Sequence, residues 1–266
     1  MKHVLSIAGT DPSGGAGAAA DCKTFCAHGC FALNVITAVV SQNTQGVRGY
    51  MDVTPDLIAD QIDAVFEDID VDAVKSGMVS VPETIRVIAD KLKQYTPRVV
   101  VIDPVMVATS GHRLLVPEAE QTLRDILLPL ADVLTPNIPE AEVLTGKEIH
   151  SLADMEAVGR EIAAMGAKAV LVKGGHRVED ATDLLFDGTD VHYFKGQRVE
   201  STSTHGTGCS LSSAIASNLA NGMKLSDAVA AAKHYVFTGI AHAEPIGKGH
   251  GPIHHFYELY KKAGLI

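Results

Sequence analysis

Short apolar stretches alternate with amphipathic ones along most of this chain, and this alternation is the feature that most restricts its fold. The first apolar stretch, Lys2 to Ala8, is followed by a glycine-rich turn and an alanine-rich helix from about Ala16 to Ala27. The order of strand and helix then repeats, which is typical of a parallel sheet covered on both faces. We therefore expect an α/β fold: a three-layer sandwich with a mainly parallel central sheet and helices on both faces.

Spacing, breakers and caps place the other elements. Strands are predicted at Leu33–Val40, Ala73–Ser76, Arg98–Ile102, Ala131–Leu134 and Ala169–Val172, with a hairpin at Asp187-Gly188. Helices are predicted at Pro55–Asp68, from Pro82 through Leu92, at Pro117–Leu127 and Ile138–Leu144, from the cap Ser151 to Met165, at Cys209–Asn221, and from the cap Ser226 to about His242. Neither a repeat nor a linker interrupts this pattern, so residues 1–266 are expected to form one domain.

Net charge and hydropathy argue against two classes of partner, nucleic acids and membranes. The chain has 22 Lys and Arg against 32 Asp and Glu, a formal net charge of -10, which would repel nucleic acid and anionic membranes. The N-terminal apolar run, Val4 to Ala8, is shorter than the roughly 7 to 15 residues of a signal-peptide core, and no run approaches the ~20 residues of a membrane helix. We expect a cytoplasmic protein with neither nucleic acid nor membrane as a partner.

Three of the four cysteines, Cys22, Cys26 and Cys30, are spaced by four, as in some metal sites. Gly29 is expected to end the helix that carries the first two, which places Cys30 in a turn, so the thiols need not converge. Free cysteines are most often buried as small apolar residues. That use is favoured here over an iron-sulfur or zinc site.

The first glycine loop offers a dinucleotide site. Gly15, Gly17 and Ala20 match the fingerprint G-x-G-x-x-A after a strand and at the start of a helix. Such a site also needs an acid about 20 residues further on, and no Asp or Glu lies between Asp21 and Asp52. An NAD-dependent dehydrogenase is therefore a weak alternative.

The second glycine loop, Thr204 to Cys209, precedes an alanine- and serine-rich helix. Its two glycines let consecutive amides turn toward one point, with the positive end of the helix dipole behind them. The loop contains no Walker lysine. It is either an ordinary helix entry or an anion hole.

Charged side chains at strand exits favour the anion hole. Asp103 and Glu140 follow neighbouring predicted strands, and two carboxylates suit hydrated magnesium. Lys173 adds a positive charge at a further strand exit. An anion hole, a magnesium site and a cation are together the parts required for phosphoryl transfer from ATP.

Motifs along nearly the whole chain resemble those of the ribokinase-like superfamily, and within it the hydroxymethylpyrimidine and phosphomethylpyrimidine kinases of thiamine biosynthesis. The motifs are Ile7–Gly17, Asp21 with Lys23–Phe25, Gln42–Thr44, Lys75–Met78, Asp103–Met106, Thr135–Glu140, Lys173–His176, His205–Cys209 and Gly251–His255. The resemblance implies a ribokinase-like fold. It also implies two successive ATP-dependent reactions, in which the hydroxymethyl pyrimidine becomes a monophosphate and the monophosphate becomes a diphosphate.

The resemblance also implies roles for individual residues. The superfamily usually has Asp, as the base, where this chain has Cys209, and a cysteine resembles the pyrimidine kinases and related pyridoxal kinases. Cys209 is therefore the candidate base, and its place at a helix N-terminus is expected to lower its pKa. The other implied catalytic groups are the amides of Gly206, Thr207 and Gly208. The implied substrate contacts are Gln42, Asp21, Met78 and Val105. Lys173, Lys233, His205 and Asn137 would lie near the nucleotide, and Asp103 and Glu140 would hold magnesium with support from Asn137.

Two alternatives remain within this scaffold: a pyridoxal kinase, and a sensor that binds nucleotide without turnover. The resemblance further implies a homodimer.

Overall fold

A central sheet carries the fold in the computed structural model, which describes residues 1–107, 114–175, 181–196 and 199–266. Its strands are β1 (His3–Ala8), β2 (Phe31–Ile36), β5 (Ala73–Ser76), β6 (Val100–Ile102), β7 (Val133–Leu134), β8 (Val170–Val172), β9 (Asp183–Phe186) and β10 (Val191–Phe194). In the described residues their order is β10-β9-β8-β7-β6-β5-β1-β2. Pairing is parallel from β2 to β8 and antiparallel at β9 and β10. The predicted mainly parallel sheet and the hairpin at Asp187-Gly188 are confirmed.

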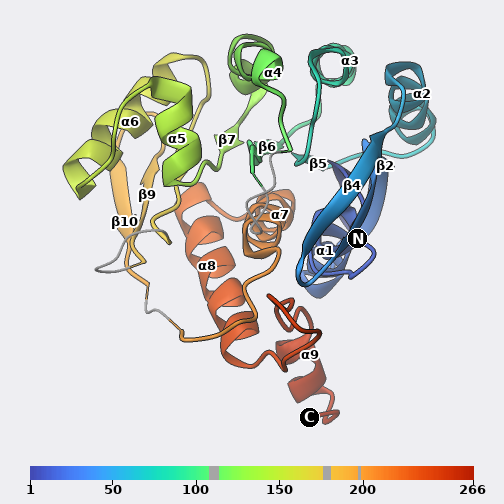
Figure 1. Cartoon of the computed structure of the whole chain (residues 1–266), viewed down its shortest axis with the longest axis vertical. Coiled ribbons are helices and arrows are strands. Elements are labelled where there is room, and N and C mark those ends of the chain that lie inside the picture. Colours follow the sequence, from blue (N-terminus) through green and yellow to red (C-terminus); the bar gives the residue numbers. More distant parts are fainter. Residues whose placement is uncertain (108–113, 176–180, 197–198) are drawn as a thin grey trace.

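Helices cover both faces, because successive strand residues point to opposite sides of the sheet. In β6, Val100 and Ile102 pack into one apolar cluster and Val101 into another. One face carries α2 (Pro55–Phe66), α3 (Pro82–Tyr95), α4 (Pro117–Thr122), α5 (Ile138–Thr145) and α6 (Leu152–Ala164), and the other carries α1 (Gly17–Ala27), α7 (Thr207–Ala220) and α8 (Leu225–Ala241) (Figure 1). The three-layer arrangement is confirmed. Among the helices of the described residues, none has the length and apolarity needed to cross a membrane.

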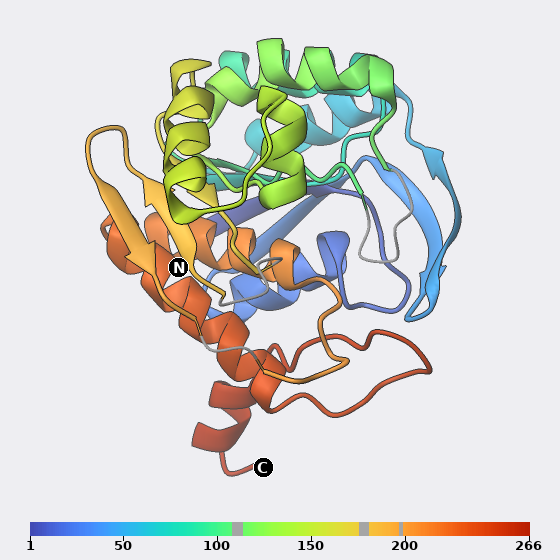
Figure 2. The same ribbon diagram turned by 60° about the vertical axis from the view of Figure 1, so that its left-hand side comes forward.

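The predicted strand at Leu33–Val40 is wrong as a single element. Thr37 interrupts it, and the chain then forms β3 (Ala38–Asn43), which pairs antiparallel with β4 (Gly46–Asp52) in a separate two-stranded sheet. The Thr37 hydroxyl donates a hydrogen bond of 2.7 Å to the carbonyl oxygen of Met78, which fixes the chain where it leaves the main sheet. Figure 2 shows β3 and β4 as a ribbon at one edge of the molecule.

Side-chain caps begin α2, α5 and α6. The Ser151 hydroxyl accepts from the Asp154 amide at 3.1 Å and the Asp154 carboxylate accepts from the Ser151 amide, so the predicted cap at Ser151 is confirmed and forms a capping box. The predicted cap at Ser226 is wrong, since α8 already includes that residue. The predicted helix Pro117–Leu127 is a short α-helix followed by a π-helical turn at Leu123–Leu127.

The four cysteines are free thiols. Cys30 is buried and Cys22 half-buried, but Cys26 is exposed, so the expected burial is wrong for Cys26. The described parts of the chain contain no group of three or more His, Cys, Asp or Glu side chains that could hold a metal ion.

Beyond α8, the chain ends in α9 (Tyr257–Lys262), which projects from the body of the fold (Figure 1).

Candidate active site

A large cavity opens where the strand order reverses. The chain adds β2 on one side of β1 and then β5 to β8 on the other, and ligands of open α/β sheets bind beyond the carboxyl ends of strands at such a point. The cavity there measures about 1350 Å³. The predicted site residues that line it are Gln42, Met78, Asp103, Val105, Asn137, Glu140, Lys173, His205, Gly206, Thr207, Gly208, Cys209 and Lys233. The structure thus brings all of the predicted site residues except Asp21 to one cavity.

The second glycine loop forms the start of α7. Gly206 is the N-cap residue, with a φ of 73° that favours glycine, and the helix begins at Thr207 rather than at the predicted Cys209. The amides of a first helical turn have no partner within the helix and carry the positive end of the helix dipole. Because this turn lines the cavity, its amides can serve as the anion hole.

The two glycine loops pack against each other, although nearly 190 residues separate them in sequence. A Cβ atom at Gly206 would overlap the carbonyl oxygen of Gly15, and one at Gly17 would overlap that of Gly9. Gly17 also has a φ of 55°. Close approach of the Gly9 backbone thus accounts for Gly17, and close approach of the His205 ring accounts for Gly15, the two glycines that resemble a dinucleotide fingerprint.

Asp11 joins the two loops. Its Oδ2 accepts hydrogen bonds from Nε2 of His205 at 2.7 Å and from the amide of Ala16 at 2.8 Å, and its Oδ1 accepts from the hydroxyl of Ser13 at 2.7 Å. Burial alone would raise the pKa of Asp11, but hydrogen bonds from His205 and Ser13 lower it to about 2. His205 therefore holds the anion-hole loop in place besides lining the cavity. Sequence reasoning gave Asp11 no role, although it lies in one of the motifs.

Asp103 and Lys173 form a buried ion pair beside the anion hole. Nζ of Lys173 lies 2.7 Å from Oδ1 of Asp103, which also accepts from the Thr135 hydroxyl at 3.1 Å. Burial opposes ionisation of Asp103, but Lys173 and Lys75 lower its pKa below the usual value. A Cβ atom at Gly208 would lie 3.6 Å from Oδ2 of Asp103, so the carboxylate reaches the first turn of α7.

Asn137 and Glu140 occupy fixed places because they cap α5. The Asn137 side chain accepts from the Glu140 amide at 2.9 Å, and the Glu140 carboxylate accepts from the Asn137 amide at 2.8 Å. Burial raises the pKa of Glu140 to about 7, and the nearby Asp103 also raises it, against the opposing effect of Lys173. Both carboxylates line the cavity and repel each other there.

The pKa expected for Cys209 is wrong. Burial raises the pKa of the Cys209 thiol to about 11, and Asp21 and Asp103 add to this effect, while Lys75 opposes it. The desolvation of the sulfur outweighs the favourable field of the helix N-terminus, so Cys209 is a neutral thiol near pH 7.

Part of the cavity wall is apolar, where Val40, Met78, Val105 and Leu114 pack together. Gln42 lies at an irregularity in the β3–β4 pairing between Ser41 and Gln42, and such bulges redirect side chains. Gln42, Met78 and Val105 all line the cavity. A polar amide in this apolar wall is suited to recognising one edge of a ring.

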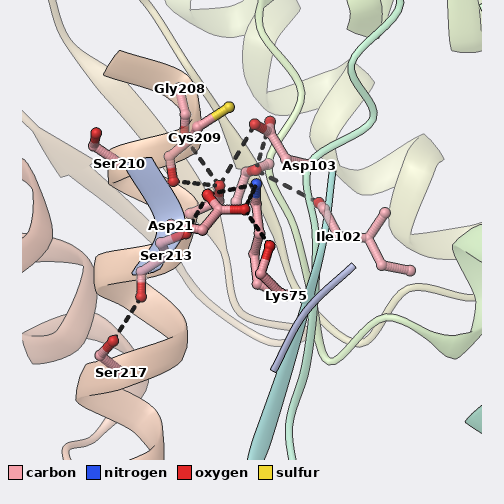
Figure 3. Close-up of polar contacts among 12 residues, drawn as sticks. Asp21, Lys75, Ile102, Asp103, Gly208, Cys209, Ser210, Ser213 and Ser217 are labelled. Carbon is pink, nitrogen blue, oxygen red and sulfur yellow. Dashed lines mark hydrogen bonds and ion pairs between the residues drawn. The ribbon is translucent and has the colours of Figure 1, made fainter. Parts of the chain in front are cut away.

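Asp21 does not line the cavity, so its prediction as a substrate contact is corrected. Its carboxylate is fully buried and lies 2.9 Å from Nζ of Lys75 through each of its oxygens. Figure 3 shows the two residues beneath Cys209 and beside α7. The signal for this pair in the sequence is Lys75 itself, a charged residue within a short buried strand.

Lys233 lines the cavity but is held to its wall. Its ammonium donates to the carbonyl oxygen of Ala181 at 2.6 Å and contacts Oδ2 of Asp183 at 2.5 Å. His176, the last residue of the Lys173–His176 motif, lies outside the described residues.

Comparison with protein families and curated proteins agrees with this geometry. A family model described as phosphomethylpyrimidine kinase matches residues 11–254. A protein of Rhizobium meliloti named hydroxymethylpyrimidine/phosphomethylpyrimidine kinase is 51% identical over 97% of this chain and 98% of its own length. The thiamine biosynthesis bifunctional protein ThiED of Geobacter sulfurreducens is 49% identical over 95% of this chain, which spans only 52% of that protein.

Solved structures with the same fold include a phosphomethylpyrimidine kinase and pyridoxal kinases. The phosphomethylpyrimidine kinase of Clostridium difficile is 48% identical, with a TM-score of 0.81 over 89% of this chain and 98% of its own. A pyridoxal kinase of Bacillus subtilis, solved as an ADP complex, is 35% identical, with a TM-score of 0.89 over 97% and 99%. These neighbours establish a ribokinase-like kinase fold.

The Asp11 contacts predict a pH-dependent contribution to stability. The pKa of Asp11 is lowered to about 2, so the contribution is present above the ordinary pKa of 3.8 and is lost as the pH falls toward 2. Asp11→Asn should lower the free energy of unfolding at pH 7 by about 2 kcal/mol, and the difference from wild type should shrink as the pH falls from 4 toward 2. Denaturant titrations at several pH values measure both.

Asp187→Asn is the matched control, because Asp187 also pairs with a histidine but lies on an exposed hairpin, where solvent weakens the interaction. An Asp11 variant as stable as wild type at pH 7 would contradict the assigned role.

Proposed function

The chain belongs to the phosphomethylpyrimidine kinase family, and we propose that it uses ATP to phosphorylate 4-amino-5-hydroxymethyl-2-methylpyrimidine and then the resulting monophosphate, for thiamine biosynthesis. One observation carries this function: the first turn of α7 lines the same cavity as Asp103, Glu140 and Lys173. Amide donors, carboxylates and a cation in one cavity are the requirements of phosphoryl transfer.

The relatives support both substrates. The name of the Rhizobium protein, which matches this chain over nearly its whole length, contains both kinase activities. The Bacillus pyridoxal kinase binds ADP in its crystal structure, as an ATP-dependent enzyme does. The remaining part of the Geobacter bifunctional protein has no counterpart in this chain, and its activity is not transferred here.

The anion hole is proposed to stabilise the transferred phosphoryl group. The amides of Gly206, Thr207, Gly208 and Cys209 would donate hydrogen bonds to its oxygens, which carry the negative charge in a loose transition state. Asp11 keeps these donors in place through its hydrogen bond with His205. The donors therefore need not reorient when the transition state forms.

Lys173, Asn137, His205 and Lys233 are proposed to border the nucleotide. Lys173 lies beside Gly208, whose Cβ position is 3.4 Å from the lysine Nζ, so its charge would act on phosphates bound at the anion hole. Lys233 is held at the cavity wall by Asp183 and Ala181. Its positive charge would therefore act on the nucleotide phosphates from that wall.

Asp103 and Glu140 fit a magnesium ion, because they bring two carboxylates to one cavity where their charges repel. When bound, magnesium would supply positive charge to the phosphate oxygens of ATP. Of the two, Asp103 is already neutralised in part by Lys173, and Glu140 is fixed in position by the cap of α5.

Cys209 is proposed as the base of the first reaction. The alcohol must lose its proton to become a phosphate ester, whereas a phosphate monoester is already ionised near neutral pH. Because the resting thiol is neutral, it must itself lose a proton before it can accept one from the alcohol. Only the first reaction carries this requirement.

Gln42 is proposed to select the pyrimidine. Its amide can both donate to and accept from the aminopyrimidine edge, while Met78 and the main chain at Val105 border the ring. The sequence identity of 48% with a pyrimidine kinase against 35% with a pyridoxal kinase favours the pyrimidine as substrate.

The chain is proposed to form a homodimer through the β3–β4 sheet. Two apolar side chains of this sheet, Val39 and Met51, are 52% and 70% exposed. Sedimentation should give twice the 28.0 kDa mass of the chain, and Val39→Lys should yield a monomer. A wild-type protein of single-chain mass at micromolar concentration would refute the dimer.

Cys209→Ala should slow phosphorylation of the alcohol far more than phosphorylation of the monophosphate, by about 100-fold or more in kcat for the first reaction alone. Separate assays of the two acceptors measure this partition. Cys26→Ala, at an exposed thiol that does not line the cavity, is the control and should change neither rate. Equal losses in both reactions would remove Cys209 from the role of base.

Gln42→Met should lower the ratio of hydroxymethylpyrimidine to pyridoxine turnover, by about tenfold for a lost amide contact. Assays of both alcohols with ATP and magnesium give the ratio. An unchanged ratio would show that Gln42 does not set the base preference.

Glu140→Gln should raise the magnesium concentration needed for half-maximal activity by about 10- to 100-fold. Glu148→Gln, on the exposed surface, is the control. A magnesium titration that is identical for wild type and Glu140→Gln would exclude Glu140 as a ligand.

A further inference from the structure

A buried ion pair outside the cavity has no part in the function described so far. Lys75 on β5 and Asp21 on α1 have side chains that are both 0% exposed, and Nζ of Lys75 lies 2.9 Å from each carboxylate oxygen. Burying two charges costs several kcal/mol per ion, and an apolar pair of similar size is often as stable. Stability alone is therefore a weak reason for this pair.

The pair connects the middle of α7 to the sheet. The Asp21 carboxylate accepts from the Ser213 hydroxyl of α7 at 2.7 Å and from the Ser6 hydroxyl of β1 at 2.6 Å. Ser213 lies four residues after Cys209, one turn along the same side of the helix. Figure 3 shows Asp21, Lys75 and Ser213 gathered against this part of α7. Four elements thus meet at one carboxylate directly below the candidate base.

The ammonium lies under the wall of the cavity. A Cβ atom at Gly77 would be only 2.8 Å from Nζ of Lys75, and the next residue, Met78, lines the cavity. Burial alone would lower the pKa of Lys75, but Asp21, Cys209 and Asp103 raise it above its usual value. Lys75 therefore stays a cation and does not release a proton near pH 7.

The pair acts unequally on the thiol. Lys75 lowers the pKa of Cys209 more than Asp21 raises it, after the larger effect of burial. The charged groups around Cys209 are Lys75 from β5, Asp21 from α1, Asp103 after β6, and Lys173 after β8. Of the two cations, Lys75 alone has a partner outside the cavity, so the binding of substrates leaves its pairing intact.

We propose that Lys75 is a positioning residue for Cys209: its ammonium, held by Asp21 as a fixed counter-ion, stabilises the thiolate that accepts the alcohol proton, and Asp21 joins the pair to α7 through Ser213. This proposal rests on the proposed role of Cys209 as base. Asp21 orients the ammonium of Lys75 and partly offsets the effect of its positive charge on the sulfur of Cys209.

Alkylation of Cys209 by iodoacetamide tests the proposal without turnover, since the reagent reacts with the thiolate. The rate is followed at pH 8 to 9 by mass spectrometry of the Cys209 peptide, with the exposed Cys26 of the same chain as internal reference. Lys75→Met should slow alkylation of Cys209 about tenfold, equivalent to a rise of one pKa unit, and Asp21→Asn should accelerate it. The double variant, which lacks both charges, should remain slower than wild type because the effect of Lys75 exceeds that of Asp21.

A merely structural role predicts a different pattern, in which every variant loosens α7 and exposes the thiol, so that alkylation accelerates in all three. That pattern, or rates equal to wild type, would overturn the proposal. If Lys75→Met is too unstable to purify, the double variant and Asp21→Asn still give the opposite signs that the proposal requires.

Steady-state assays separate this proposal from the proposed function. Lys75→Met should lose kcat for the alcohol about tenfold and the double variant by a smaller factor, each with little change in the KM for ATP or in the monophosphate reaction. If wild type phosphorylates both acceptors and the double variant has the same kcat values, the proposed kinase function stands. That result would exclude a role for Lys75 in the reaction.

Discussion

The alternation of buried charges around the first turn of α7 is the constraint on which the rest of this structure depends. Asp21, Lys75, Asp103 and Lys173 lie in succession around this turn, and each charge is paired with one of opposite sign. An unpaired charge at any of these places would cost several kcal/mol in a low-dielectric interior. The parallel sheet contributes to the arrangement, because Asp103 follows β6 and Lys173 follows β8 at the same edge. Lys75 lies within β5, and Asp21 comes from α1.

The anion hole depends on contacts between distant parts of the chain. The loop before α7 is packed against the loop after β1, and Asp11 fixes the two together through His205. The C-terminal segment supports the same loop, since the His205 amide donates to the carbonyl oxygen of Gly251 at 3.0 Å. The amides of the candidate anion hole are thus positioned before any ligand arrives, which is the condition for electrostatic stabilisation of a transition state.

The sequence predicted most of the site because strand exits can be recognised locally. Asp103, Glu140 and Lys173 each follow a short apolar run, so the prediction of a parallel sheet was enough to bring them together. The fold class followed from the same alternation. The family resemblance added Gln42, which local reasoning could place only as a polar residue after a strand.

The sequence misled where the outcome depended on tertiary packing. Asp21 faces the interior because α1 turns it toward Lys75, and no local pattern distinguishes that direction from the cavity. Thr37 breaks an apolar run that reads as one strand, because its side chain bonds to a residue 41 positions away. The pKa of Cys209 is set by burial rather than by its helix position alone, and burial is known only once the sheet and α7 are packed.

The most direct test of the account is to incubate the purified chain with hydroxymethylpyrimidine, ATP and magnesium and to follow the products by mass. The shared cavity predicts that the monophosphate appears first and the diphosphate later, and that neither forms when magnesium is omitted. A protein that binds ATP with both acceptors but forms no phosphorylated pyrimidine would contradict the claim that α7 and the two carboxylates make one phosphoryl-transfer site.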